Sequence, residues 1–253
     1  MRHLTSIAAL VGFFLSSVAI AAPAPDPDRE VKEIITRALN AKGDVAVREK
    51  YKASTCKFTG TYFVDGMEIS AYGIGQEQEP DKDMIKATLK FAGTDVSYIQ
   101  VYNNGKGWLS INGATQELDK KTLDEDREHR HAGHLAALYG LDAPGLKITL
   151  LPESKVEGKR AIGIRISSAG YRDVSLYFDR ENALLLKRSM QGRDVATGKV
   201  SLHERIYSNY RNISGLMEAT KVVDQADGKT LMILELSDIE ICEKLPDSAF
   251  AKP

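Results

Sequence analysis

Three histidines lie close together in the stretch EHRHAGH, at His129, His131 and His134. If this stretch is helical, His131 and His134 share one face, whereas His129 and His131 lie about 200° apart around the axis. Two imidazoles on one face could bind a metal ion, and the other ligands of a tetrahedral site would have to come from elsewhere. The competing interpretation is a polar, solvated helix start. Metal binding at His131 and His134 is therefore the weakest of the functional hypotheses.

Familiar catalytic motifs do not occur in this sequence. It contains no GxSxG, GxxxxGK(S/T), CxxC or HExxH pattern. His203-Glu204 begins like a zinc-protease motif, but Tyr207 stands where the second histidine belongs, and the surrounding pattern is that of a strand. We therefore expect neither an enzyme nor a bound cofactor.

Cys56 and Cys242 are the only cysteines of the chain. Cys56 falls in the first predicted strand and Cys242 at the end of the last, so a disulfide would join the two ends of the fold. Such a bond would add roughly 5 kcal/mol in the chain-entropy model. The alternative is two separate buried thiols. Spacing alone leaves the choice open, because a disulfide needs Cα atoms within about 7 Å of each other.

The first 21 residues have the pattern of a secretory signal peptide. A short positive start precedes the mostly apolar LTSIAALVGFFLSSV, and AIA supplies a cleavage pattern that ends at Ala21. We expect cleavage near Ala21, a proline-rich leader over residues 22–27 and a single domain over residues 28–253. The mature protein is then periplasmic or secreted.

Charges are balanced and interspersed along the chain. The 34 lysines and arginines stand against 35 aspartates and glutamates, a formal net charge of −1. Neither nucleic acid nor an anionic membrane surface is indicated as a partner. We expect a monomer.

Hydrophobic periodicity predicts two substantial helices. Apolar residues recur with helical spacing from Val31 to Leu39, which predicts a helix over residues 28–41 that Gly43 closes. Thr122 and Glu125 fit a capping box that opens a second helix, to about residue 139.

Most of the remaining chain alternates with a period of two. It gives about ten or eleven short strands, separated by turns such as Asp65-Gly66. The connections are too short for crossovers between parallel strands, so the sheet is antiparallel. We predict an α+β fold in which a strongly curved antiparallel sheet, a half-open β-barrel, wraps over two helices.

The second half of the chain carries a family pattern. VSLYFDRENALLLKR is followed by a tyrosine-containing turn, a DG hairpin and the ending LPDSAFAKP, in which Asp247, Phe250 and Pro253 fit the form DxxFxxP. Over residues 173–253 this order resembles the outer-membrane lipoprotein-sorting family, the LolA/LppX-like fold. One feature differs: the family's best-known carriers latch the lid with an arginine on an early strand, and residues 54–102 contain no arginine.

The resemblance implies a half-open barrel with helices lying in its mouth like a lid. An acyl chain or lipid would bind between sheet and lid, with membrane-bound donor and acceptor proteins as further partners. In such a shell Leu184 and Leu186 point one way and Leu185 the other. The candidate cavity-wall residues are Phe58, Tyr62, Tyr98, Trp108, Ile162, Ile164, Leu176, Phe178, Leu184 and Leu186.

Three functional hypotheses follow. The first is a non-catalytic periplasmic carrier or sensor that binds a lipid, or the acyl chains of a lipoprotein, in an apolar cavity. The second is a secreted cell-envelope scaffold that uses the same shell, with a filled core, to bind proteins. The third is the metal-binding protein around His129, His131 and His134. An accessible apolar cavity of several hundred Å³ would favour the first over the second.

Overall fold

The structure is a computed structural model that describes residues 27–195 and 197–253. The predicted signal peptide, its cleavage near Ala21 and most of the 22–27 leader lie outside these residues. The α-helices are α1 (Pro27–Lys42), α2 (Val45–Lys50) and α3 (Lys120–Ala136), and a short 3₁₀ helix, η1 (Asp247–Phe250), lies close to the C-terminus. The strands are β1 (Ala53–Val64), β2 (Met67–Gln78), β3 (Lys82–Phe91), β4 (Thr94–Asn103), β5 (Lys106–Ile111), β6 (Ala114–Glu117), β7 (Lys147–Val156), β8 (Lys159–Ser167), β9 (Val174–Asp179), β10 (Leu185–Arg193), β11 (Val200–Ile213), β12 (Leu216–Ala226) and β13 (Lys229–Cys242).

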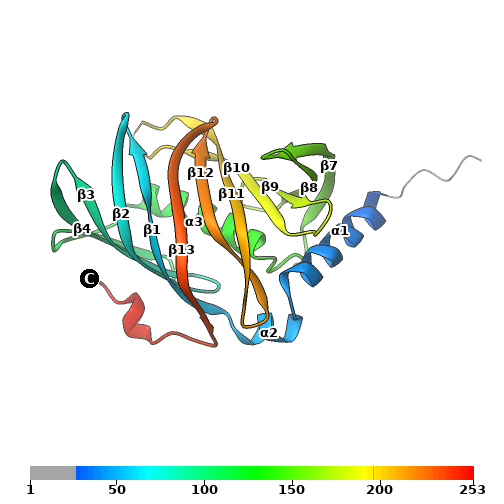
Figure 1. Ribbon diagram of the computed structural model, residues 1–253, viewed down its shortest axis with the longest axis horizontal. Helices are drawn as coiled ribbons and strands as arrows, with labels where there is room; N and C mark the ends of the chain where they lie inside the picture. The colour runs from blue at the N-terminus through cyan, green and yellow to red at the C-terminus, as the bar shows by residue number, and fades with distance from the viewer. Residues whose placement is uncertain (1–26, 196) are drawn as a thin grey trace, which may run out of the picture.

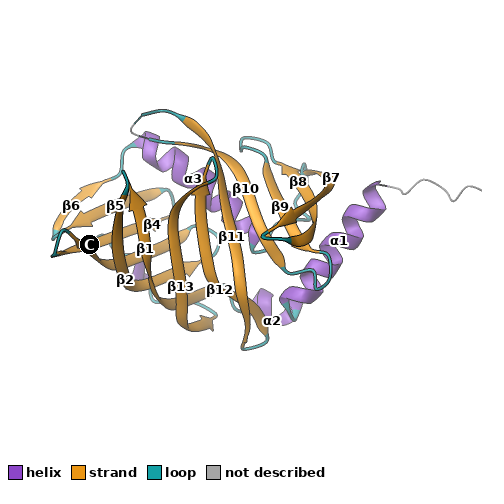
Figure 2. Ribbon diagram, turned by 45° about the horizontal axis from the view of Figure 1, so that its top comes forward, coloured by secondary structure: helices purple, strands orange, loops and turns teal. Residues whose placement is uncertain are grey.

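All thirteen strands of the described residues join one antiparallel sheet, in the order β6-β5-β4-β3-β2-β1-β13-β12-β11-β10-β9-β8-β7. The chain starts in the middle at β1, runs outward to the β6 edge, crosses through α3 to the β7 edge, and returns strand by strand to β13. β6 and β7 remain edges, so the sheet is not closed. Figures 1 and 2 show it bent around α3.

The predicted class, a curved antiparallel α+β sheet over helices, is confirmed, but the predicted numbers are wrong. The described residues hold thirteen strands and three α-helices, not ten or eleven and two. β6 has the sequence ATQE, which is too short and too polar to show an alternating pattern. α2 has only six residues and begins where the Asp44 side chain accepts a hydrogen bond from the Ala46 amide at 2.7 Å.

The N-terminal helix forms where the apolar spacing predicts it. Val31, Ile34 and Ala38 are buried and pack in the core cluster that includes residues of β7 and β8. Gly43 ends the helix with a φ of +132°, and a Cβ atom there would lie 2.3 Å from the Gly215 carbonyl oxygen. Only glycine fits this position, because it combines the left-handed backbone with a close approach to β12.

The start of α3 differs from the predicted capping box. Asp119, not Thr122, is the N-cap, and its carboxylate accepts a hydrogen bond from the Thr122 amide at 2.8 Å. Glu125 is buried and binds both terminal nitrogens of Arg172, at 2.6 and 2.7 Å. The glutamate that the pattern assigned to capping therefore fastens the helix to the segment before β9.

The two faces of the sheet are covered by different parts of the chain. We call the face that carries α1 and α3 the inner face, and the opposite one the outer face. The segment that ends in η1 covers the outer face of β3 and β4, where Phe250 is fully buried against a cluster containing Met84 and Val101. No helix within the described residues is long and apolar enough to cross a membrane.

Candidate functional site on the inner face of the sheet

A single row of directly paired residues crosses the inner face from one half of the sheet to the other. Residues paired in this way point to the same face. From β8 to β1 the row reads Ile164, Leu176, Arg188, Arg205, Asp224, Met232 and Tyr62. It is apolar at both ends and charged in the middle. We call Arg188, Arg205 and Asp224 the charged seam.

Arg205 and Asp224 form the paired part of the seam. Two parallel hydrogen bonds join them, from Nε and Nη2 of Arg205 to the two carboxylate oxygens, each 2.6 Å long. Burial alone would lower the pKa of Arg205, but the Asp224 carboxylate outweighs it and raises that pKa. Burial also opposes the ionised form of Asp224, yet Arg205 holds the pKa of this carboxyl below its usual value. Both groups therefore remain charged inside the fold.

Arg188 is the unpaired part of the seam. Its residue is 8% exposed, and its Nη1 donates a hydrogen bond to the His129 carbonyl oxygen of α3 at 3.0 Å. Among the described residues no carboxylate lies within ion-pair distance of it. Burial lowers the pKa of its guanidinium, and the nearby Arg205 acts in the same direction. The sheet thus holds a buried cation beneath α3.

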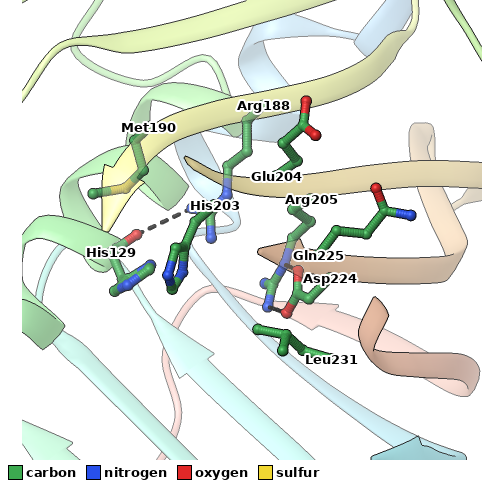
Figure 3. Close-up of a pocket in the computed structure, with 9 residues that line it drawn as sticks. All are labelled: His129, Arg188, Met190, His203, Glu204, Arg205, Asp224, Gln225 and Leu231. Carbon is green, nitrogen blue, oxygen red and sulfur yellow. Dashed lines mark hydrogen bonds and ion pairs between the residues drawn. The ribbon is translucent and has the colours of Figure 1, made fainter. Parts of the chain in front are cut away.

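A small cavity of about 80 Å³ opens beside the seam (Figure 3). The rings of His129 and His203 lie with their centroids 5.2 Å apart in its wall. Burial and the neighbouring Arg188 lower the pKa of His129 to about 4, so this imidazole is neutral at pH 7. The lining residues are His129, Arg188, Met190, His203, Glu204, Arg205, Asp224, Gln225 and Leu231.

A second cavity, of about 150 Å³, lies where α2 meets the ends of β1, β2, β12 and β13. Its wall mixes aliphatic residues with Arg48, Glu77, Glu79 and Tyr139. Glu77 is exposed at the edge of this cavity. Desolvation by the surrounding wall and the neighbouring Glu79 raise the pKa of its carboxyl. Both cavities are smaller than the roughly 300 to 1,000 Å³ of typical small-molecule sites.

The three histidines of EHRHAGH contact three different sets of partners. His129 faces His203, while His131 stacks on Tyr171 and bonds to Ser168. His134 contacts the Glu79 carboxylate and stacks on the Tyr139 ring. Within the part of the chain that the structure describes, no three His, Cys, Asp or Glu side chains could hold one metal ion. These histidines attach α3 to its surroundings.

Polar contacts also hold α3 to β3 and β4. The Arg130 guanidinium lies 2.8 Å from the centre of the Tyr102 ring and 3.6 Å from the Asp83 carboxylate. Burial raises the pKa of Asp83 to about 6, although Arg130 acts against the shift. Asp126 Oδ2 and two nitrogens of Arg130 are buried without a hydrogen-bond partner among the described residues. On this side of α3 some buried polar atoms lack hydrogen-bond partners, whereas its apolar side is closely packed in the core.

The predicted cavity-wall residues fall into separate groups. Ile162, Ile164, Leu176 and Phe178 lie in the core cluster beneath α1 and α3. Phe58, Tyr62 and Tyr98 gather in a second cluster on the inner face. The structure brings neither Trp108 nor Leu186 to these clusters, because Trp108 packs with the outer-face cluster of Phe250 and Leu186 packs with Val156 and Ala161.

The leucine run of β10 has the opposite orientation to the one expected. Leu185 packs in the cluster beneath the helices, whereas Leu186 belongs to the cluster that contains Tyr177 and Ile206. Leu184 is partly buried and precedes the strand. A β-bulge between Leu185 and Lys187 shifts the register against β9 and accompanies this reversal.

We call the second inner-face cluster the aromatic patch. It is formed by Phe58, Tyr62, Leu89, Tyr98, Leu234 and Leu236, with Ala71 and Ala87 between them. Burial raises the pKa of Tyr98 to about 12, so its hydroxyl stays protonated. Burial also raises the pKa of Tyr62, which lies close enough to the Arg205–Asp224 pair for both charges to act on it. No helix residue belongs to this cluster.

Both cysteines are free in the structure. Cys56 lines the second cavity on the inner face, whereas Cys242 packs with the outer-face cluster and pairs with Ala53. Ala53 and Cys56 are three positions apart and therefore point to opposite faces of β1. The two sulfur atoms cannot meet without a rearrangement of the strand.

No protein-family model and no curated protein sequence matches this chain. Solved structures match its fold. A LolA superfamily protein from Nitrosomonas europaea is 13% identical with a TM-score of 0.54, covering 87% of this chain and 97% of that protein. A DUF1329 family protein from Desulfovibrio piger is 10% identical with a TM-score of 0.57, covering 90% and 98%.

A third structure is described as an outer membrane lipoprotein-sorting protein domain, from Vibrio parahaemolyticus. It is 13% identical with a TM-score of 0.54, and the match covers 87% of this chain and 97% of that domain. The chain therefore has the fold shared by these proteins, as the motifs of residues 173–253 predicted. At such low identities the likeness concerns the fold alone.

Proposed function

We propose that this protein is a non-catalytic carrier or sensor of the periplasm. It binds a lipid, or the acyl chains of a lipoprotein, between α3 and the inner face of the sheet. The observation that carries the proposal is the aromatic patch, an apolar surface on the inner face to which no helix residue contributes. The shared fold with a lipoprotein-sorting domain supports the same class of ligand.

The attachment of α3 fits a ligand that enters beneath it. On one side Ala132 and Leu135 are buried in the apolar cluster with β9 and β10. On the other side Arg130 makes polar contacts with β3 and β4, and His134 contacts Glu79, directly after β2. Partly exposed ion pairs contribute about 1 kcal/mol or less each, whereas a buried leucine contributes more. Movement of α3 away from β2–β4 would uncover the patch and leave the apolar side packed.

Such a movement is necessary for the proposal. The cavities of about 80 and 150 Å³ are too small for a lipid tail. Burying a chain of ~16 carbons would contribute up to about 13 kcal/mol before the cost of ordering it, which exceeds the combined cost of separating the polar contacts of α3. Membrane-bound donor and acceptor proteins would then deliver and receive the ligand.

The small cavities also favour a second candidate, the cell-envelope scaffold. In that case α3 stays in place, the interior remains filled, and the outer surface binds a protein. The two candidates differ in one property, namely whether the aromatic patch takes up apolar ligand.

Native mass spectrometry of the mature protein, purified from its own envelope without detergent, tests the proposal. Extra mass that extracts into organic solvent as lipid or acylated peptide would support the carrier. A bare polypeptide that also fails to bind a fluorescent fatty acid would contradict it and leave the scaffold.

A matched pair of tyrosine variants connects the binding to the patch. Tyr98→Ser removes a ring of the aromatic patch, whereas Tyr72→Ser removes a 46% exposed ring from the neighbouring region of the sheet. We expect the first change to weaken fluorescent fatty acid binding about tenfold, from the loss of apolar contact area, and the second to leave it unchanged. Equal effects of the two changes would contradict binding at the patch.

A further inference from the structure

Arg188 is a buried charge whose partner is not supplied by its surroundings. It is 8% exposed, and its Nη1 donates a hydrogen bond to a neutral acceptor, the His129 carbonyl oxygen at 3.0 Å. A buried cation without an anion is costly, because the carbonyl replaces only part of its lost hydration. The cation is therefore suited to receive an anionic group.

Neighbouring cations in the same region do have their own carboxylates. Arg205 bonds to Asp224, Lys187 to Glu204 and Arg172 to Glu125, each at 2.6 Å. The carboxylate of the same row, Asp224, lies beyond Arg205, and both of its oxygens already bind Arg205. Arg188 thus differs from these three in having no carboxylate partner among the described residues.

There is also room for a small anionic group beside Arg188. The cavity of about 80 Å³ that Arg188 lines has space for two or three groups the size of a water molecule, which suits the three heavy atoms of a carboxylate. His129 and His203, which line the same cavity, offer ring nitrogens as hydrogen-bond donors.

An apolar surface begins at the other end of the same row. Tyr62 of the aromatic patch pairs with Met232, which pairs with Asp224 of the seam. A molecule with its charged end at Arg188 would therefore extend along the inner face onto Tyr62 and the rest of the patch. Between Arg188 and Met232 the row holds Arg205 and Asp224, which neutralise each other. An unpaired cation at one end and an apolar surface at the other match an amphiphile with one anionic head and one long tail.

We propose that Arg188 binds the carboxylate of a fatty acid or a similar single-chain carboxylic amphiphile, whose tail lies on the aromatic patch. This inference rests on the proposed function, because it specifies the ligand of that site. The small volume of the cavity and the single unpaired cation in its wall favour one carboxylate over a larger or more highly charged anion.

The test compares palmitate with hexadecanol, which has the same tail length and no charge, by calorimetric titration of the full mature protein at pH 8. We expect palmitate to bind at least about tenfold more tightly, as a charge-assisted pair would give. Arg188→Met should remove this preference and leave hexadecanol binding unchanged. The control Arg165→Met, at an exposed position of β8, should keep the preference.

Each outcome bears on a different part of the proposal. Equal affinities of the unaltered protein for palmitate and hexadecanol would overturn the carboxylate site while leaving the proposed carrier intact. Binding of neither would also overturn the carboxylate site, and together with a bare polypeptide in native mass spectrometry it would overturn the carrier itself. If Arg188 only positions α3, Arg188→Met would weaken both ligands equally, which would also overturn the assignment. The comparison in the unaltered protein needs no variant, so a folding defect of Arg188→Met would not prevent the test.

Discussion

The two halves of the inner face are built from the same kind of strand and covered in different ways. In the first, which we call the covered half, Ile164, Leu176 and Phe178 lie beneath α1 and α3 and are at most 2% exposed. In the second, the aromatic patch includes partly buried tyrosines and leucines and has no helix residue. The second half is supported from behind instead, where η1 packs on the outer face of β3 and β4.

We infer from this difference that the covered half mainly stabilises the fold and that the patch binds the ligand. A surface sealed by two helices contributes to the folded core and cannot accept a ligand without losing it. A surface that is stabilised from its opposite face can be uncovered by a movement of α3 without losing that support. The charged seam lies at the boundary between the two halves, so a ligand fixed there would have its apolar part directed to the patch.

The largest effect is expected from removing the support behind the patch. Phe250 is fully buried, and its cluster covers the outer face of β3 and β4. Phe250→Ala should lower the free energy of unfolding by about 3 to 5 kcal/mol, because it leaves a cavity that the short η1 segment cannot fill. Urea denaturation followed by tryptophan fluorescence measures this directly, since Trp108 packs against the same cluster.

Phe91 provides the control for this change. It lies at the end of β3 and is 42% exposed. Phe91→Ala should cost less than about 1 kcal/mol. If both phenylalanine variants lost the same stability, the C-terminal segment would not be the support of this half.

A matched pair of leucines compares the two halves of the inner face themselves. Leu176 of the covered half is fully buried, whereas Leu89 of the patch is partly buried. We expect Leu176→Ala to lower the free energy of unfolding by about 2 to 5 kcal/mol and Leu89→Ala by about 1 kcal/mol, both measured by urea denaturation.

Ligand binding should respond in the reverse order. Leu89→Ala removes apolar area from the patch and should weaken fluorescent fatty acid binding several-fold, while Leu176→Ala, studied well below its unfolding midpoint, should leave it unchanged. The division between a stabilising half and a binding half fails if Leu176→Ala weakens binding more than Leu89→Ala does.

Local features of the fold follow from the sequence because their causes are local. The spacing of Val31, Ile34 and Ala38 gives α1, and Asp65-Gly66 gives the hairpin of β1 and β2. The DxxFxxP ending also proves structural: Phe250 is buried, and Asp247 pairs with Lys82 at 3.1 Å.

The seam depends instead on the register between distant strands. Arg188, Arg205 and Asp224 come from three strands, and only their pairing places them in one row. The sequence holds a weak signal, because Arg188 stands two positions before Met190, an apolar residue that faces inward on the same strand. Bulges limit such reasoning: the one between Leu185 and Lys187 reverses the expected orientation of the leucine run.

The pH dependence of stability compares two places where α3 contacts the sheet, at His129 and at Asp83. The pKa of His129 is lowered to about 4 from 6.5, so between these values the unfolded chain binds more protons than the folded one. The contribution of His129 to the free energy of unfolding is therefore present above pH 6.5 and is lost as the pH falls through 4. The pKa of Asp83 is raised to about 6 from 3.8, so its contribution is present below pH 3.8 and is lost as the pH rises through 6.

The two groups therefore oppose each other between about pH 4 and 6.5. We expect Asp83→Asn to make acidification more destabilising and His129→Gln to make it less so, each by about 1 kcal/mol, a figure discounted because the His129 side chain is 33% exposed. Unfolding midpoints in urea at pH 4, 5, 6 and 7, measured for both variants and the unaltered protein, would show these opposite changes. Parallel pH profiles for the two variants would contradict the assignment.

The smallest effect is expected from reducing agent. Cys56 faces the inner cavity and Cys242 the outer cluster, and both are free, so dithiothreitol should leave the thermal unfolding midpoint unchanged. Burial raises the pKa of Cys56 to about 11, which keeps its thiol protonated and slow to react with iodoacetamide at pH 8. A midpoint that falls on reduction would reveal a bond between the faces. It would mean that the β1–β13 pairing at the centre of the sheet, which orients the patch, differs from the one described.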